Sequence, residues 1–379
     1  MKTTILARLG LAGSIAAIAA MGLAATAAHA QSNVTIYGLI SGGVGYVSNT
    51  GGSKNWQALS GTNQNPRWGF RGSEDLGNGT KAIFTLEAGF SIVNGTGAQN
   101  GRAFGRQSFV GLSDKTWGTF TLGRQYDTIH DYVGPIIISS NGVNIGDNDN
   151  GYNDLRMQNS VKWVSPTVSG FHGTAQYGFS NSATGFRNNN AYSFGLGYKY
   201  GDFDWNAAYA QYNNPFSGTN NDGAIANDYA SPLLIFSKSA TRANVFASQQ
   251  RIFATGGFYR WGPALIGAMF SDVNYTYLDN SHLHLQNYNL TLNYNVTPAL
   301  VLGAAYGFTS GKYDVINTRP QWHQVNLQAD YWLSKRTDVA LTLNAQQAAG
   351  DAKYAQLFGY AASSTKRQMA VTLGMRHTF

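Results

Sequence analysis

Hydrophobic and polar residues alternate with a period of two over stretches of about ten residues along most of this chain. Between 169 and 179, apolar positions such as Phe171 and Tyr177 are separated by polar ones such as His172 and Thr174. Successive side chains of a β-strand point to opposite faces, so the pattern predicts strands with one apolar and one polar face. The same rhythm returns at 191–200, 299–308 and 323–331. About ten residues is the length at which a tilted strand crosses the hydrocarbon layer of a membrane.

The connections between these stretches alternate in length. Tight turns such as 201–202 follow every second stretch, whereas long polar segments such as 49–64, 126–155 and 213–249 follow the others. Soluble β-sandwiches also alternate, but short turns on one rim and long loops on the other are typical of outer-membrane barrels. After Ala30 no run approaches the about 20 apolar residues of a membrane helix.

This division predicts an all-β fold, a 16-stranded antiparallel transmembrane β-barrel with both chain ends on the same rim. Sixteen strands would enclose an aqueous channel. We expect the strands at 33–48, 65–72, 79–90, 102–113, 117–125, 156–165, 169–179, 191–200, 203–212, 250–260, 264–275, 283–295, 299–309, 321–333, 337–347 and 368–379.

The first thirty residues have the pattern of an export signal. Lys2 and Arg8 form a basic start, an Ala- and Gly-rich apolar run follows, and Ala28-His29-Ala30 is a small-x-small cleavage site. A transmembrane anchor is the alternative, because the run is nearly long enough to span a bilayer. We expect a signal peptide at 1–30 and one β-barrel domain at 31–379, since no linker or change of composition divides the rest.

Composition and charge narrow the class of protein. The chain has 45 Gly, 22 Tyr, 20 Phe, 8 Trp and no Cys, with only 12% charged residues. An aromatic but hydrophilic chain suits a barrel with an apolar outer band and a polar inner wall. Removing Lys2 and Arg8 from the 26 Lys and Arg leaves 24 against 19 Asp and Glu, a net charge of +5. The chain lacks the dense Lys and Arg blocks of a nucleic-acid binder, so no nucleic acid is expected as a partner.

Several motifs resemble a known family. Residues 66–87 read PRWGFRGSEDLGNGTKAIFTLE, and three further motifs agree with it: GRAFGRQSFVGL with WGTFTLGRQYD at 101–127, YWLSKRTDVALT at 331–342, and the ending GMRHTF. In combination they resemble the general porins of Gram-negative bacteria, in particular the betaproteobacterial type, over essentially the whole chain after residue 30.

The resemblance implies a homotrimer in the cell outer membrane, reached through the periplasm, and a long third loop folded into the lumen as a constriction. That loop would be 126–155. Its carboxylates would be the acidic side of the constriction: Asp127, Asp131, Asp147, Asp149 and Asp154. The alternative for each of them is an acid that merely keeps a long loop soluble.

The resemblance also implies a basic wall opposite the loop. Alternation supports it, because Arg67 and Arg71 share one face of their stretch while Trp68 and Phe70 share the face that lipid would accept. The expected basic wall is Arg67, Arg71, Lys81 and Arg106. Acid facing base across a narrow wet neck would orient dipolar solutes and set an ion preference. The alternative is a solvated wall that only keeps the lumen wet.

Two residues depart from this scheme. Arg124 falls in phase with Phe120 and Leu122 on the lipid side, so we expect it at a strand end or in a subunit contact. Ser41 stands where members of the family often carry Asp, which would tilt the lumen further towards anions.

The C-terminus carries a separate signal. Val371, Leu373, Met375, His377 and Phe379 form one face of the last stretch. A terminal Phe on an amphipathic strand resembles the mark that the outer-membrane assembly machinery recognises, so Phe379 is the expected assembly signal. The implied partners are a second and third copy of the chain, outer-membrane lipid and lipopolysaccharide, the assembly machinery, and small hydrophilic solutes and ions.

The function predicted is a general porin, a water-filled channel for passive diffusion of small hydrophilic solutes and ions with a weak preference for anions. It is not an enzyme and needs no cofactor.

A barrel hydrolase is an alternative, but no His lies in a recognisable nucleophile motif. A sugar-specific channel would show aromatic residues along the lumen face. The run Asp147 to Gly151 resembles a calcium loop but has Gln158 where the loop needs Glu, which leaves only a divalent ion on a surface loop as an open alternative.

Overall fold

The computed structural model describes residues 33–138, 142–183, 185–216, 218, 220–225 and 227–379. Its strands are β1 Asn33–Thr50, β2 Ser53–Ser60, β3 Arg67–Gly77, β4 Thr80–Gly89, β5 Gln107–Asp114, β6 Gly118–Gln125, β7 Met157–Val164, β8 Phe171–Gly178, β9 Asn190–Tyr200, β10 Phe203–Asn213, β11 Ala247–Trp261, β12 Ala264–Tyr277, β13 His282–Asn295, β14 Leu300–Tyr313, β15 Pro320–Ser334, β16 Thr337–Gly350 and β17 Arg367–Thr378. The expected signal peptide at 1–30 lies outside the described residues.

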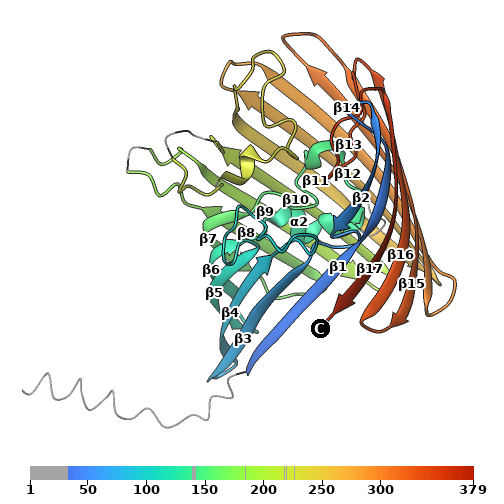
Figure 1. The fold of residues 1–379 in the computed structure, drawn as a ribbon. Helices are drawn as coiled ribbons and strands as arrows, with labels where there is room; N and C mark the ends of the chain where they lie inside the picture. The colour runs from blue at the N-terminus through green and yellow to red at the C-terminus, as the bar shows by residue number, and fades with distance from the viewer. Residues whose placement is uncertain (1–32, 139–141, 184, 217, 219, 226) are drawn as a thin grey trace, which may run out of the picture.

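The strands form one closed antiparallel barrel (Figure 1). From β3 to β17 each strand pairs with the next one along the chain, and β1 closes the ring by pairing with β17 from Leu39 opposite Thr378 to Val47 opposite Ala370. Closure leaves no free sheet edge, so every strand can find its backbone partners within the wall. The prediction of a 16-stranded antiparallel barrel is therefore confirmed.

One position in the wall is shared by two strands. Within the described part of the chain there are seventeen strands, because β1 pairs with β3 along Asn33–Leu39 and with β2 along Gly42–Thr50. The prediction that 49–64 is entirely loop is wrong for β2. The polar β2 residues pair with the upper half of β1, and the Trp56 ring packs 5.2 Å from the Tyr46 ring between centroids.

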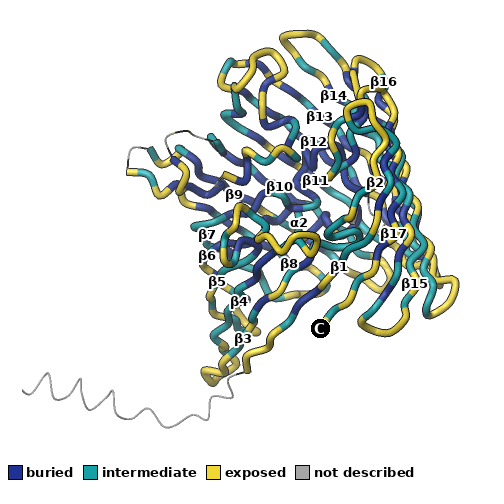
Figure 2. Tube along the Cα trace, viewed as in Figure 1, coloured by how far each residue is buried: buried dark blue, intermediate teal, exposed yellow. Residues whose placement is uncertain are grey.

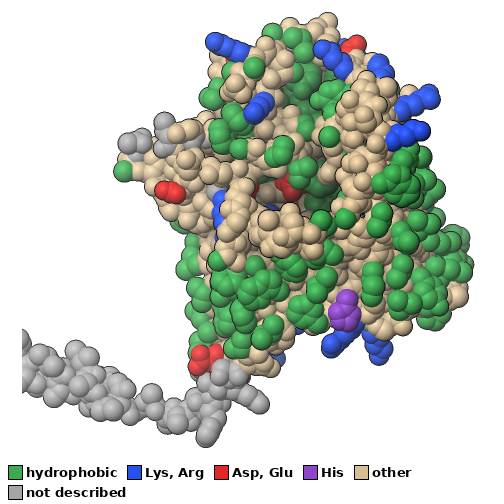
Figure 3. Space-filling view, viewed as in Figure 1, with side chains coloured by type: hydrophobic (Ala, Val, Ile, Leu, Met, Phe, Trp, Pro, Cys, Tyr) green, Lys and Arg blue, Asp and Glu red, His purple; other side chains and the backbone are tan. Residues whose placement is uncertain are grey.

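The alternation along each strand separates an apolar outer surface from a polar inner one. On β9 the outward Phe194 is 51% exposed, whereas its neighbour Ser193 is fully buried inside the ring. Figure 2 shows this change from buried to exposed residue by residue along the strands. Hydrophobic side chains cover the lower part of the visible outer wall in Figure 3, while several Lys and Arg side chains gather at the upper rim and at the lower edge. This is the division of surfaces that a membrane requires.

The segment between β6 and β7 lies inside the ring and carries the short helices α2 Thr128–Tyr132, α3 Gly134–Ile138 and η1 Ile145–Asp147 (Figure 1). It is fastened to the inner wall by polar contacts: the Tyr132 hydroxyl lies 2.9 Å from Thr174 Oγ1, and Asn287 Nδ2 donates to Asn148 Oδ1 at 2.7 Å. The inward polar side chains of β8 to β13 thus serve as its anchors.

A second long segment, 214–246, also folds into the ring, with the short helix η2 Asn227–Ala230. Its Tyr229 and Phe236 join Ile129 and Ile136 of the first segment in one buried apolar cluster against the wall. This internal core fills one side of the barrel. No helix among the described residues is both long and apolar enough to cross a membrane.

Candidate channel constriction

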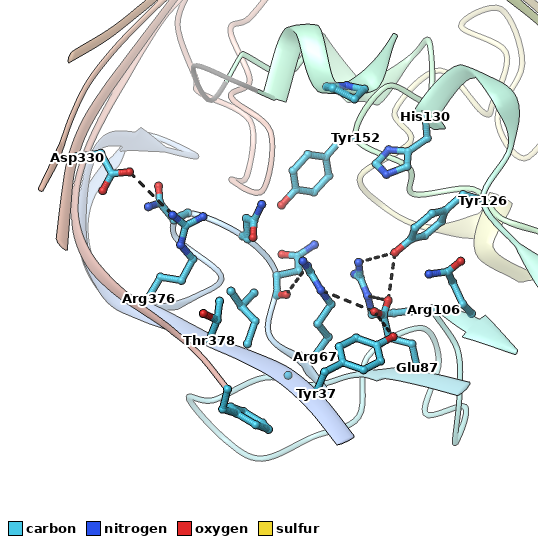
Figure 4. A pocket seen from close by; sticks show the side chains of 18 of the residues that line it. Tyr37, Arg67, Glu87, Arg106, Tyr126, His130, Tyr152, Asp330, Arg376 and Thr378 are labelled. Carbon is cyan, nitrogen blue, oxygen red and sulfur yellow. Dashed lines mark hydrogen bonds and ion pairs between the residues drawn. The ribbon is translucent and has the colours of Figure 1, made fainter. Parts of the chain in front are cut away.

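The internal core leaves a hollow of about 850 Å³ on the other side of the barrel, which we call the central hollow (Figure 4). Residues of β1, β3, β4 and the start of β5 line one side of it. Residues of β13, β14, β15 and β17 line the other, and the 126–156 segment contributes Tyr126, His130, Pro135 and Tyr152. The hollow is therefore bounded by wall and infolded loop together.

Two arginines of the predicted basic wall meet at one carboxylate. Arg106 Nε donates to Glu87 Oε1 at 2.7 Å, and Arg67 Nε lies 3.8 Å from Glu87 Oε2. The Tyr37 and Tyr126 hydroxyls also donate to Glu87, at 2.9 and 3.2 Å. Figure 4 shows these five side chains converging from the wall and the loop. The Glu87 carboxylate thus orients both arginines, and the combined charge of the three side chains is positive.

The other two predicted wall residues lie differently. Arg71 lines the central hollow with its guanidinium 5.2 Å from the centre of the Tyr37 ring. Lys81 is exposed and lies opposite Asp75 and Ser113 at the turn end of β4, outside the lining of the hollow. The structure therefore brings Arg67, Arg71 and Arg106 together and leaves Lys81 near the short-turn rim.

A further charged group lies across the hollow and was not singled out from the sequence. Arg376 Nε donates to Asp338 Oδ2 at 2.6 Å, and Arg376 Nη2 lies 3.9 Å from Asp330 Oδ2. Figure 4 places Arg376 and Asp330 on the opposite side of the space from Arg106. The signal was present, because Arg376 alternates with the outward Met375 and His377.

Three of the predicted loop acids are enclosed in the 126–156 segment. Asp127 caps α2, accepting from His130 N at 3.0 Å, and also accepts from Asn150 Nδ2 at 2.8 Å. Asp149 accepts from Ser271 Oγ at 2.7 Å, and Asp147 accepts from Tyr152 N at 2.8 Å. Burial raises the pKa of all three carboxyls. These acids hold the segment in shape and do not face the hollow.

The remaining two acids have different surroundings. Asp131 forms an ion pair with Lys162 on β7. Asp154 lines a second, smaller hollow of about 240 Å³ that shares Asn65 and Tyr152 with the central one. Burial raises the pKa of Asp154 to about 6 although Arg156 opposes the shift. Of the five predicted loop acids, none lines the central hollow itself.

Burial also affects the basic groups of the segment. It lowers the pKa of His130 to about 4, so this ring is neutral at pH 7. It lowers the pKa of Arg156 to about 10, where the guanidinium still carries its charge, 5.5 Å from the centre of the Tyr126 ring. The loop therefore presents tyrosines and a neutral histidine to the central hollow, while the Arg156 cation is buried beside Tyr126.

Arg124 lies at the end of β6 as predicted, but the lipid-side phase is wrong. The register of β6 shifts between Gly123 and Gln125, and Gly123 has a φ of 137°. Such a bulge turns the next side chain to the other face. Arg124 is therefore buried inside, where it donates to Gly105 O at 2.7 Å and forms an ion pair with Asp228.

Ser41 faces inward and is fully buried. Its hydroxyl lies 3.4 Å from Thr62 Oγ1 and accepts from Asn63 N at 3.3 Å. A carboxylate at this position would add negative charge to the lumen. Ser41 instead holds the segment between β2 and β3 through its contacts with Thr62 and Asn63.

Phe379 closes the barrel wall beside Gly38. The backbone N and O of Phe379 each bond to Gly38 at 3.1 Å. A Cβ on Gly38 would lie 2.2 Å from the Phe379 ring, so only glycine leaves room for that ring. No group of three or more His, Cys, Asp or Glu placed to hold a metal ion is found in the ranges that the structure describes.

A closed antiparallel barrel with an apolar outer surface, a polar inner wall and an internal hollow defines the class of membrane channels built from β-strands. The sequence matches the family described as Gram-negative porin over residues 16–351. The chain belongs to the Gram-negative porin family, and with it to the outer membrane.

Relatives agree with this assignment. The chain is 30% identical over 372 residues to the major outer membrane protein P.IB of Neisseria meningitidis serogroup B, covering 95% of this chain and 98% of that protein. It is 38% identical over 197 residues to an outer membrane porin protein of Bordetella pertussis, covering 48% of this chain and 49% of that one. Its fold is similar to that of an anion-selective porin from Comamonas acidovorans, with a TM-score of 0.75, 21% identity, and coverage of 92% and 100% of the two chains.

Proposed function

We propose that this porin is a general diffusion channel that prefers anions. The observation that carries the proposal is the central hollow, whose lining has four arginines, Arg67, Arg71, Arg106 and Arg376, against two carboxylates, Glu87 and Asp330. A positive surplus in a narrow, wet neck attracts anions and repels cations. The burial of Asp127, Asp147 and Asp149 removes the acids that would have balanced it. The structural neighbour from Comamonas acidovorans is itself described as anion-selective, which supports the proposed preference for anions.

The mechanism is passive diffusion. The strands satisfy their backbone groups within the wall, the outer surface seats the barrel in lipid, and the 126–156 segment restricts the passage to small hydrophilic solutes and ions. The long-loop rim would face the cell exterior and the short turns the periplasm. Two of the tyrosines in the hollow, Tyr37 and Tyr126, are fixed by Glu87, so they offer no free ladder for a sugar.

The proposal includes the partners that a porin needs. A homotrimer would form through the outer face of the early strands, where Val34, Ile36 and Trp68 are exposed. One neighbour in fold, OmpT of Vibrio cholerae, is described in a trimer form, at 15% identity and a TM-score of 0.68. Phe379 would serve the assembly machinery, the 1–30 segment would direct export, and lipid with lipopolysaccharide would surround the wall.

The test is the reversal potential of the purified protein in a planar bilayer under a KCl gradient. The native channel should show large conductance steps and a potential on the anion-selective side. Replacing Arg67 and Arg71 by Gln removes two charges from the hollow and should shift the potential towards cation selectivity.

The matched control is Lys81→Gln, which removes one charge outside the hollow and should leave the potential nearly unchanged. An equal shift from Lys81→Gln would mean that the short-turn rim sets the selectivity. Absence of channels from the folded, inserted protein would refute the diffusion channel altogether.

A further inference from the structure

The smaller hollow of about 240 Å³ beside the central one is enclosed by two long loops. Tyr152 and Asp154 of the 126–156 segment line it on one side, and Phe358 of the 351–366 segment, between β16 and β17, lines it on the other. The rings of Tyr152 and Phe358 pack 4.9 Å apart between centroids, so the two loops meet at this point. Both loops belong to the long-loop rim, which places the smaller hollow towards that rim.

The smaller hollow carries the opposite charge to the central one. Among the described residues that line it, Asp154 is the charged group and none is Lys or Arg, whereas arginines outnumber carboxylates in the lining of the central hollow. Arg156 is near enough to oppose the rise in the pKa of Asp154, yet the two side chains form no ion pair. Enclosed charges in proteins are normally paired. The Asp154 carboxylate therefore offers a place for a cation from outside.

Two buried oxygens at this hollow lack a hydrogen-bond donor. Asp154 Oδ2 and Asn344 Oδ1 have no partner among the residues that the structure describes, and both side chains line the hollow. Buried acceptors without a donor are rare, because each has lost its hydrogen bonds to water. An ammonium group has three N–H donors and can serve two acceptors at once. The same space is lined by Tyr152, Phe358 and Tyr360, and aromatic rings attract cations as well.

Two residues separate the smaller hollow from the arginines. Asn65 and Tyr152 line both hollows, and Arg67 Nη1 donates to Asn65 O at 3.3 Å on the side of the central one. Figure 4 shows the Tyr152 hydroxyl directed into the central hollow. Burial and the charge of Asp154 raise the pKa of Tyr152 to about 12, and the charges of Arg106 and Arg67 oppose this rise. Tyr152 is therefore neutral and lies between a carboxylate and two guanidinium groups.

We propose that the smaller hollow binds the ammonium group of an ω-amino acid, whose carboxylate then lies on the Arg67 side of Tyr152. A cation alone would meet only Asp154 and an anion alone only the arginines, whereas a solute with both charges meets both. Because Asn65 and Tyr152 lie between the two hollows, methylene groups must separate the two charges of the solute, and the apolar side chain of Leu357 offers them contact. The inference rests on the proposed function, since the carboxylate end needs the positive charge of the central hollow.

The experiment is a saturation-transfer NMR titration of the folded protein in detergent at pH 8, where Asp154 is charged. The probes are γ-aminobutyrate, butyrate and n-butylammonium, which share one chain length and differ in their charges. The native protein should bind γ-aminobutyrate more tightly than either single ion. Asp154→Asn should weaken the binding of γ-aminobutyrate and n-butylammonium about 10-fold, the value of one charge-assisted hydrogen bond, and leave butyrate unchanged. Arg67→Gln should show the reverse pattern, weakening γ-aminobutyrate and butyrate but not n-butylammonium.

The matched control is Asp222→Asn, which removes an exposed acid of the 214–246 segment that lines neither hollow and should leave all three dissociation constants unchanged. Unchanged binding of butyrate also shows that Asp154→Asn is folded. Equal affinity of the native protein and Asp154→Asn for γ-aminobutyrate would overturn the proposal, as would an equal loss in the control. Binding of neutral n-butanol as tight as that of n-butylammonium would overturn it too, because the hollow would then take the chain without its charge.

The reversal potential of the same protein separates this inference from the proposed function. An anion-selective channel whose binding of γ-aminobutyrate does not depend on Asp154 contradicts the amino-acid site alone. Binding that depends on Asp154, in a protein that forms no channels, contradicts the diffusion channel alone.

Discussion

Glu87 is the residue on which the basic wall depends. Its side chain is 5% exposed and is contacted by Arg67, Arg106 and two tyrosine hydroxyls. Glu87→Gln keeps the shape but removes the negative charge, so the hollow gains one net positive charge. We expect a reversal potential further towards anion selectivity, and a loss of stability of about 1–3 kcal/mol from the weakened bonds of buried Arg106.

The potential is measured under the same KCl gradient, and the stability by the temperature at which the folded band is lost in gel electrophoresis. Glu74→Gln, on the exposed end of β3, is the matched control and should change neither. A shift towards cations would mean that Arg106 leaves the hollow once Glu87 no longer holds it.

At the scale of single residues, the sequence predicted which face of the barrel wall a side chain lies on but not its position along the barrel axis. Alternation correctly turned Arg67 and Arg71 inward, yet the same reasoning included Lys81, which lies six positions before Glu87 on β4, near the turn. Arg124 was assigned to the wrong face because a bulge at Gly123 breaks the phase, and no period of two can show a bulge in advance.

At the scale of elements, the 214–246 segment is fastened to the rest of the lumen by Asp228. This carboxylate forms ion pairs with Arg124 of β6 and, at 2.8 Å, with Arg102 of the preceding long loop. Asp228→Asn leaves Arg124 buried beside a neutral partner, and breaking a buried pair costs about 3–5 kcal/mol. We expect the segment to loosen, with faster hydrogen exchange at Ala224, Ile225 and Tyr229 while the wall strands keep their protection.

Asp222→Asn removes an exposed acid from the same segment and is the control, expected to leave exchange unchanged. Burial alone would raise the pKa of Asp228, but Arg124 and Arg102 hold it below its usual value. The pair is therefore fully formed above the unfolded pKa and is lost only as pH falls through the lower folded pKa. Loosening of the native protein at pH 6 would contradict this pairing.

The strands were largely predictable and the loops were not. A period of two is imposed by the bilayer on one side and water on the other, and it marked every strand except β2, whose polar sequence resembles a loop. The apolar cluster of Tyr229 and Phe236 with the 126–156 segment has no period, because irregular chain buries residues wherever its path allows. Only the resemblance to general porins indicated that 126–155 folds inward, and nothing indicated the same for 214–246.

For the whole molecule, the charge of the lumen should depend on pH through Asp154, which lines the smaller hollow next to the central one. Burial raises its pKa to about 6. The carboxyl is therefore charged at pH 8 and mostly neutral at pH 5, so acidification removes one negative charge from the passage. We expect anion selectivity to rise as pH falls through about 6, measured as the reversal potential from pH 8 to pH 5.

Asp154→Asn should remove the contribution of Asp154 to this step, so that the potential of the variant changes less between pH 8 and pH 5 than that of the native channel. His130 does not contribute to the change in charge over this pH range, because burial lowers its pKa to about 4. The stability of the fold should also rise as pH falls. Because the folded pKa of Asp154 lies above its unfolded value near 3.8, Asp154 destabilises the fold as pH rises from about 4 to 6. If Asp154→Asn kept the step, another group would be titrating, and the smaller hollow would not lie on the path of the ions.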